Sequence, residues 1–253
     1  MAYEKITFTG SRGHELAARL DLPGDAIKAY GLFAHCFSCS KDLSAVNRIS
    51  RALNDDGIAV FRFDFTGLGQ SDGNFSNTNF TSNVADILAA VDYMRSNLEA
   101  PAVMMGHSLG GAATFMAANN VPEVRAVATI GAPANAHNVL KQFGDDIETI
   151  EAEGEANVLL GGRPFVIKKQ FIDDARDQDL LAEVTALKKP LLVMHSPIDE
   201  TVDIDHAREI YEAAKHPKSF VSLDTADHLL MKNAADSKYV ARVISAWASQ
   251  YIH

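Results

Sequence analysis

The pentapeptide Gly106-His107-Ser108-Leu109-Gly110 is the feature that most constrains how this chain folds. It follows the short apolar segment 102–105 and precedes the Ala-rich segment 111–118, which predicts a strand, a sharp turn and a helix. Glycines two residues to either side let the neighbouring backbone pass a strained serine without a clash. The start of the following helix favours an anion beside that serine. The pattern therefore predicts a reactive Ser108 held above a sheet.

Short apolar segments alternate with amphipathic ones along most of the chain. Apolar runs and period-two alternation predict strands, whereas helical spacing predicts helices. Strands that alternate with helices predict an α/β fold with a mainly parallel central sheet covered on both faces. We expect strands at 3–9, 14–21, 29–35, 58–63, 102–105, 124–130, 191–195 and 219–223, and helices at 43–55, 80–98, 109–119, 204–215 and 234–251. The first two strands should pair as an antiparallel hairpin.

The charge-rich segment 133–188 interrupts this alternation. Its pattern predicts a helix, a hairpin and a second helix, with hairpin strands at 157–160 and 165–167 joined across the Gly-rich segment 161–164. We interpret residues 1–253 as one domain with this segment as a small inserted cap above the serine. Such caps shape a substrate pocket and exclude water. The alternative is a surface excursion without substrate contact.

Composition limits the classes of partner. With 253 residues, 47% hydrophobic and 22% charged, the chain has the make-up of an ordinary globular protein. Its formal net charge of −10 opposes attraction to nucleic acid or to an anionic membrane, so we expect neither as a partner. No apolar run approaches the ~20 residues that span a bilayer, and the N-terminus lacks a signal-peptide pattern, which predicts a cytoplasmic location. The N-terminal hairpin leaves a homo-oligomer open.

Ser108 needs a base from elsewhere in the chain, because a serine hydroxyl is a weak nucleophile at neutral pH. In proteins with this serine turn, an acid and then the base follow the serine in sequence. His228 is the favoured base, since it lies in the loop after the last expected strand, where it can hang over the serine. His206 is expected to be exposed on a helix. The other downstream histidines are less well placed, and they are His137, His195, His216 and His253.

The loop 196–203 should supply the acid that orients this base, because it follows the strand expected before the last helix–strand pair. We favour Asp199, at a Pro-initiated turn, over its neighbour Glu200. Asp203 and Asp205 have the character of helix N-terminal residues, where carboxylates interact favourably with the helix dipole. The predicted relay is therefore serine, histidine and Asp199.

Two backbone amides are the expected donors to the negative charge that forms when a carbonyl is attacked. One should belong to Leu109, directly after the serine. The other should come from the loop after the strand 29–35, where Phe37 is favoured and Cys36 is the reserve. Core packing explains the aromatic residues of the cap equally well, but we include them among the predicted substrate contacts, which are Phe37, His107, Phe143, Phe165 and Phe171.

Cys36 and Cys39 are the two cysteines of the chain. We interpret them as small residues packed beside the amide-bearing loop, rather than as a redox dithiol or half of a metal site. A low-pKa cysteine exposed at this place would make the activity sensitive to oxidation.

No pattern in the sequence calls for a metal or a cofactor. The glycine-rich segment 62–73 lacks the spacing of a dinucleotide-binding turn, and a long loop follows it instead of a helix. We interpret Asp64 and its glycines as turns at the mouth of the sheet.

The serine turn and the surroundings of Asp199 and His228 resemble the α/β-hydrolase superfamily. More closely, the segments 32–43, 61–69 and 216–223 look like the hydrolase half of proteins that fuse an α/β hydrolase to an OsmC-type peroxide-reducing domain. A more distant resemblance is to cinnamoyl and feruloyl esterases, which carry a short inserted cap and a comparable loop after an early strand.

This resemblance covers nearly the whole chain and implies an α/β-hydrolase fold with Ser108, Asp199 and His228 as a catalytic triad. It implies the amides of Phe37 and Leu109 as the oxyanion hole. Two departures stand out: Cys36 replaces a glycine common in this loop, and the chain ends where a fusion protein would continue. We expect either a free-standing homologue or a hydrolase half separated from its partner, with an OsmC-type domain as a possible partner in homologues.

We expect a serine carboxylesterase that acts through an acyl-serine intermediate on a small-molecule ester with a short or aromatic acyl group. A thioesterase, a lactone or dienelactone hydrolase and an acyl transferase use the same chemistry and stay open. A dehalogenase is disfavoured, because its nucleophile would be an aspartate at position 108. The alternative from another class is a non-catalytic ligand-binding or interaction module of an OsmC-type system.

Overall fold

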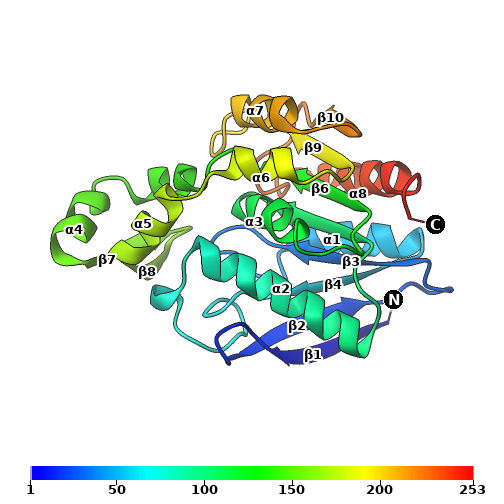
Figure 1. The fold of residues 1–253 in the computed structure, drawn as a ribbon, viewed down its shortest axis with the longest axis horizontal. Helices are drawn as coiled ribbons and strands as arrows, with labels where there is room; N and C mark the ends of the chain where they lie inside the picture. The colour runs from blue at the N-terminus through cyan, green and yellow to red at the C-terminus, as the bar shows by residue number, and fades with distance from the viewer. Residues whose placement is uncertain (1, 253) are drawn as a thin grey trace.

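A sheet of eight strands forms the centre of the molecule, which a computed structural model describes over residues 2–252 (Figure 1). The strand order is β1-β2-β4-β3-β5-β6-β9-β10. Strands β3 to β6, β9 and β10 run parallel, whereas β2 is antiparallel to both β1 and β4. The expected α/β fold with a mainly parallel sheet is confirmed. The strands are β1 (Tyr3–Thr9), β2 (Glu15–Asp21), β3 (Ala29–Ala34), β4 (Ile58–Phe63), β5 (Val103–His107), β6 (Ala126–Ile130), β9 (Leu191–His195) and β10 (Lys218–Ser222).

Helices cover both faces of this sheet (Figure 1). On one face α1 and α8 pack against each other through Val46, Ile49, Val240 and Ile244, all of which are buried. On the other face α2 and α3 bury a second apolar cluster that includes Phe115. Each such side chain stabilises the fold by roughly 1.5–3 kcal/mol. The helices are α1 (Ser44–Asp55), α2 (Phe80–Asn97), α3 (Leu109–Ala118), α7 (Asp205–Ala213) and α8 (Ala234–Ala248), and a short turn η1 (Phe75–Asn77) precedes α2.

The segment between β6 and β9 leaves the sheet: α4, α5, β7 and β8 form the lobe at the left of Figure 1, and α6 returns to lie beside α3 and α7. It contains the expected hairpin, and we call residues 133–188 the cap segment. A two-residue turn, Gly161-Gly162, joins the hairpin strands, so the turn is shorter than predicted. The elements of the cap segment are η2 (Ala136–Phe143), α4 (Asp146–Glu153), β7 (Glu155–Leu160), β8 (Arg163–Lys168), α5 (Lys169–Arg176) and α6 (Leu180–Ala186).

None of the helices within residues 2–252 combines the length and the apolar character that a membrane span requires. The cytoplasmic location stays a prediction.

The parallel strands all end at the edge of the sheet that the cap segment faces (Figure 1). Because the carboxyl ends of parallel strands meet at one edge, the loops that follow them come together there. The loops after β3, β5, β9 and β10 carry Phe37, Ser108, Asp199 and His228 respectively. This edge is where the candidate site lies.

Candidate active site

Ser108 lies at the tip of the turn between β5 and α3, with φ 55° and ψ −130°. This backbone conformation is costly for a residue with a side chain and persists only where neighbours enforce it. The flanking glycines are required by close approach: a Cβ on Gly110 would lie 2.1 Å from the carbonyl oxygen of His35, and one on Gly106 would lie 2.4 Å from Thr114 Oγ1. The pentapeptide thus folds as its pattern predicts.

Ser108, His228 and Asp199 form a continuous chain of hydrogen bonds at the sheet edge. His228 Nε2 lies 3.0 Å from Ser108 Oγ, and His228 Nδ1 lies 2.7 Å from Asp199 Oδ2. The side chains of Ser108 and Asp199 are almost fully buried, at 6% and 2% exposed. In this arrangement the imidazole of His228 can accept the proton of the serine hydroxyl while the carboxylate of Asp199 keeps the ring oriented.

The carboxylate of Asp199 is held in its ionised form. Its Oδ1 accepts hydrogen bonds from the backbone N–H groups of Thr201 and Val202 at 2.8 Å and 2.9 Å. Burial alone raises the pKa of Asp199, but the hydrogen bond and charge of His228 together with these two amides outweigh it and hold the pKa below its usual value. The group that orients the histidine therefore stays negatively charged at neutral pH.

His107 supports the histidine rather than contacting the cavity. Its Nε2 lies 2.6 Å from the carbonyl oxygen of His228, and the two rings lie 4.9 Å apart, centre to centre. Burial, followed by the charge of His228, lowers the pKa of His107 to about 3. The ring is therefore neutral and donates its Nε2–H to that carbonyl. His107 is not among the residues that line the cavity at Ser108, and its contact with substrate stays a prediction.

His195 braces the loop that carries the carboxylate, a role that the sequence analysis missed. The side chain is fully buried at the end of β9, and its Nε2 donates to the carbonyl oxygen of Val202 at 2.8 Å. The same nitrogen lies 3.7 Å from Asp199 Oδ2. Burial lowers the pKa of His195, so the ring is neutral. In the sequence, only its position at the carboxyl end of the strand before Asp199 could have indicated this role.

The expected exposure of His206 is wrong. Its side chain is buried, and its ring nitrogens lie 3.3 Å from the backbone nitrogen of Ala134 and 3.2 Å from Asn138 Oδ1. The start of the cap segment folds over the first turn of α7, which helical spacing alone could not predict. The candidate His253 lies outside the described residues.

The amides of Leu109 and Phe37 flank Ser108 from two loops. The amide of Leu109 begins α3, where a first-turn N–H has no partner inside the helix. Within residues 2–252, neither amide donates a hydrogen bond to another protein group. Both are therefore free to donate to an oxygen that becomes negative beside the serine.

Buried aromatic rings hold Phe37 in place. Its ring lies 5.6 Å from Phe75, 6.1 Å from Phe143 and 5.3 Å from Phe171, centre to centre. Phe165 packs on Phe75 at 4.9 Å. The cavity at Ser108 is not lined by Phe143, Phe165 or Phe171, and their contact with substrate stays a prediction. These three cap residues pack against Phe37 and Phe75 and so support the loop that carries the Phe37 amide.

Asp64 also holds the loop after β3, through hydrogen bonds from Lys41, so its interpretation as a turn residue was incomplete. It is fully buried and accepts hydrogen bonds from the backbone N–H of Lys41 at 2.6 Å, from Lys41 Nζ at 2.8 Å and from the N–H of Gln70 at 3.0 Å. Gly69 leaves room for this carboxylate, since a Cβ there would lie 2.3 Å from it. Breaking a buried pair of this kind typically costs about 3–5 kcal/mol.

Cys36 and Cys39 form a disulfide, which corrects their interpretation as two separately packed side chains. Their Cα atoms lie 5.3 Å apart, and the N–H of Cys39 donates to the carbonyl oxygen of Cys36 at 3.1 Å. Between them, Ser38 has a φ of 57°. The result is a small covalent ring that contains Phe37 and its amide.

A cavity of about 380 Å³ opens beside Ser108 and His228. It lies between the loops after β3, β5 and β10 on one side and the cap segment on the other. The cap segment contributes Gln142, Gly161 and Arg163 to its wall. The remaining lining residues are Cys36, Phe37, Ser38, Cys39, Ser40, Leu43, Thr201 and Leu229.

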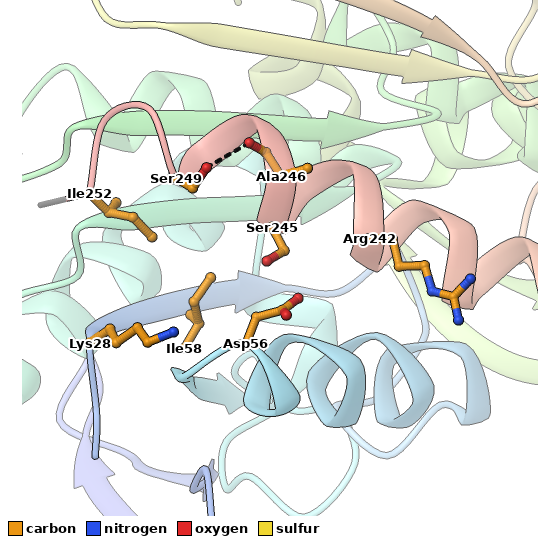
Figure 2. A pocket seen from close by; sticks show the side chains of 8 residues that line it. All are labelled: Lys28, Asp56, Ile58, Arg242, Ser245, Ala246, Ser249 and Ile252. Carbon is orange, nitrogen blue, oxygen red and sulfur yellow. Dashed lines mark hydrogen bonds between the residues drawn. The ribbon is translucent and has the colours of Figure 1, made fainter. Parts of the chain in front are cut away.

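A second cavity, of about 430 Å³, lies at the opposite end of the sheet (Figure 2). Lys28, Asp56 and Ile58, near the starts of β3 and β4, face Ser245 and Ile252 on the side of α8 (Figure 2). Although this cavity is slightly larger, the described residues that line it include no serine–histidine pair. Chemistry rather than volume therefore identifies the first cavity as the candidate active site.

Known proteins match this chain along its length. Residues 39–153 match the family described as "Serine aminopeptidase, S33". The chain is 49% identical to the esterase domain of a Rhodothermus marinus protein, with 100% of each chain covered and a TM-score of 0.82. The chain belongs to the α/β-hydrolase superfamily. This hydrolase is an enzyme of the carboxylic ester hydrolase class, as the sequence predicts.

Two further known proteins are similar to the hydrolase, one in fold and one in sequence. Est1E from Butyrivibrio proteoclasticus, solved with ferulic acid bound, shares the fold with 23% identity, 98% and 99% coverage of the two chains and a TM-score of 0.85. The mouse mitochondrial palmitoyl-protein thioesterase ABHD10 is 29% identical over 187 residues, which is 71% of the hydrolase. The hydrolase spans 62% of that relative's length. The closer resemblance to OsmC-type fusion proteins stays a prediction.

Proposed function

We propose that the hydrolase cleaves small carboxylic esters through an acyl-serine intermediate on Ser108. His228 takes the proton of the serine hydroxyl as it attacks the ester carbonyl, and Asp199 keeps the imidazole in the right tautomer and orientation. The observation that carries this proposal is the relay itself, with 3.0 Å from Ser108 Oγ to His228 Nε2 and 2.7 Å from His228 Nδ1 to Asp199 Oδ2.

The amides of Phe37 and Leu109 are proposed to bind the oxyanion of the tetrahedral intermediate. Losing one such donor typically costs about 2.7–4 kcal/mol of barrier. When the intermediate collapses, the protonated His228 passes its proton to the departing alcohol oxygen. A water molecule then attacks the acyl-serine with the same base, which releases the carboxylic acid and restores the serine.

A short or aromatic acyl group is proposed for the substrate. A cavity of about 380 Å³ is at the small end of the range for ligand pockets, about 300–1,000 Å³, so a long alkyl chain would have to extend into solvent. Phe37 and Leu43 offer apolar surface inside it. Est1E, which shares the fold, binds the aromatic ferulic acid, which supports including aromatic esters.

The first experiment compares initial rates on p-nitrophenyl esters from acetate to palmitate, and on methyl ferulate, for wild type and Ser108→Ala. We expect turnover that falls with chain length and is lost in the variant. Stopped-flow traces should show a burst of p-nitrophenol equal to the enzyme concentration if the acyl-serine accumulates. More than a few per cent of wild-type rate in Ser108→Ala would move the nucleophile elsewhere.

Labelling with a fluorophosphonate separates the remaining outcomes. If Ser108 is labelled but no ester is turned over, the reactive serine acts on thioesters or lactones. If the serine is not labelled, the hydrolase is a ligand-binding module and the proposal fails.

Thioester hydrolysis is the second candidate, because the mouse relative is a palmitoyl-protein thioesterase. The same relay can form the same acyl-serine from either substrate. We therefore compare the butyryl oxyester and thioester of one alcohol–thiol pair, choline and thiocholine. A thioester kcat/KM at least tenfold above the oxyester value would favour the thioesterase.

A further inference from the structure

The inner face of the hairpin β7–β8 carries one charged side chain among apolar ones. In the register of this hairpin, Leu160 lies opposite Arg163 and Val158 lies opposite Phe165. Residues directly opposite each other in an antiparallel pair share a face. Leu160 and Val158 are each 1% exposed, whereas their neighbour Leu159, on the other face, is 71% exposed. Arg163 is therefore on the face that is turned toward the domain.

The turn before Arg163 fixes the position of this residue at the start of β8. Gly161 and Gly162 both have positive φ, 56° and 77°, as a two-residue turn of type I′ requires. The twist of such a turn matches the twist of the strands, so β8 begins at a defined place. The charge is thus mounted on a regular element and not on a mobile surface loop.

Arg163 lines the cavity of Ser108 and His228, and it is the one arginine or lysine among the described residues that line it. One of its guanidinium N–H groups donates to the carbonyl oxygen of Ser38, and the guanidinium lies 5.3 Å from the ring centre of Phe165. Within residues 2–252 it forms no ion pair with a carboxylate. A guanidinium has five N–H donors, so four remain for a ligand.

We propose that Arg163 binds a carboxylate of the substrate, so that the hydrolase prefers esters that carry an anionic group a few atoms from the scissile bond. This inference rests on the proposed function, because it requires the ester to react at Ser108. An arginine is suited to the role, since its planar fork matches a carboxylate with two parallel hydrogen bonds. Arg163 is exposed where it lines the cavity, so its guanidinium can meet an anionic group of an ester that enters from solvent.

The test uses pairs of substrates in which one member carries a carboxylate where the other carries a methyl group or a hydrogen. On the acyl side, p-nitrophenyl hydrogen glutarate is compared with p-nitrophenyl valerate. On the alcohol side, 4-carboxyphenyl butyrate is compared with phenyl butyrate. The two arms distinguish which part of the ester carries the carboxylate, and kcat/KM is measured in each at low and high salt.

Three variants are measured with both pairs. In Arg163→Gln, we expect kcat/KM for the anionic ester of one arm to fall roughly 10- to 100-fold, while the neutral ester changes less than about threefold. Arg163→Lys should retain part of the preference, because a point charge remains without the fork. Arg176→Gln removes a charge from an exposed site on α5 outside this cavity, so it should leave the preference unchanged.

Two outcomes would overturn this inference. If the wild-type enzyme prefers the anionic ester in neither arm, Arg163 does not bind a substrate carboxylate. Equal losses on anionic and neutral esters in Arg163→Gln mean that Arg163 only holds the Ser38 carbonyl. Neither result bears on the acyl-serine, which the neutral esters and Ser108→Ala test separately.

Discussion

The two ends of the sheet carry cavities of similar volume but different construction. The cavity at the carboxyl ends, about 380 Å³, has the buried Ser108 and Phe37 in its wall, together with exposed residues such as Arg163. The cavity at the amino ends, about 430 Å³, has the exposed side chains of Lys28, Asp56 and Arg242 in its wall (Figure 2). What distinguishes the first cavity is the buried Ser108, hydrogen-bonded to His228, whereas cavity volume does not separate the two.

The difference has a physical origin in the direction of the strands. At the carboxyl ends four loops converge, and the start of α3 points its unpaired amides at Ser108. At the amino ends the lining comes from the strand starts, one side of α8 and the residues just after it. There Ser249 Oγ donates to the carbonyl oxygen of Ala246 at 2.8 Å (Figure 2).

The largest expected effect is on the carboxylate of the relay. Asp199→Asn should lower kcat on p-nitrophenyl butyrate by about 10³- to 10⁴-fold, because the amide no longer holds His228 in the productive tautomer. Asp203→Asn is the matched control, since Asp203 is exposed and bonds the backbone N–H of Asp205 at 2.8 Å. A similar loss in both variants would assign the role to the loop and not to Asp199.

The buried histidines at the carboxyl end should make the fold sensitive to acid. The pKa of His107 is lowered from 6.5 to about 3, so below pH 6.5 the unfolded chain binds a proton that the folded chain excludes. The stabilisation is therefore complete above pH 6.5 and declines as the pH falls toward 3, by about 2 kcal/mol at pH 5 for this one group. Burial also lowers the pKa values of His35, His195 and His206.

Urea denaturation at pH 7 and pH 5 measures this sensitivity. His107→Gln should lose less stability between the two pH values than wild type, although it is less stable at pH 7. His14→Gln, at an exposed site, should keep the wild-type difference. An unchanged difference in His107→Gln would contradict the assignment of a neutral buried ring.

A smaller effect is expected from opening the ring that contains Phe37. Replacing both Cys36 and Cys39 by serine leaves the amide of Phe37 present but less constrained. We expect kcat to fall roughly 3- to 10-fold, well below the 10²- to 10³-fold that a missing donor typically costs. A thiol reductant should lower the wild-type rate to the same level and leave the double variant unchanged. A reductant effect of equal size on both proteins would place its target elsewhere.

The smallest effect is expected at the amino end. Ser245→Ala and Arg242→Gln change the wall of the second cavity without touching the relay, so kcat/KM on neutral esters should stay within about twofold of wild type. A tenfold loss in either variant would show that the amino end also contributes to turnover.

Much of the fold followed from local patterns. Every strand and helix expected outside the cap segment is present, with bounds that differ by at most three residues. The turn around Ser108 was predictable because its two glycines are a steric requirement. The order of Ser108, Asp199 and His228 along the chain also led to residues that the structure brings within hydrogen-bond reach.

The sequence by itself determined the alternation of strands and helices and the serine turn, because both depend on residues close together in the chain. The tertiary structure alone decided which distant groups meet. His107 bonds the backbone carbonyl of His228, and Lys41 bonds the carboxylate of Asp64. It also decided that Arg163 faces the cavity, since this depends on a hairpin register and on how the cap segment packs. Local patterns specify which face of an element is apolar, but contacts between elements depend on how those faces are brought together.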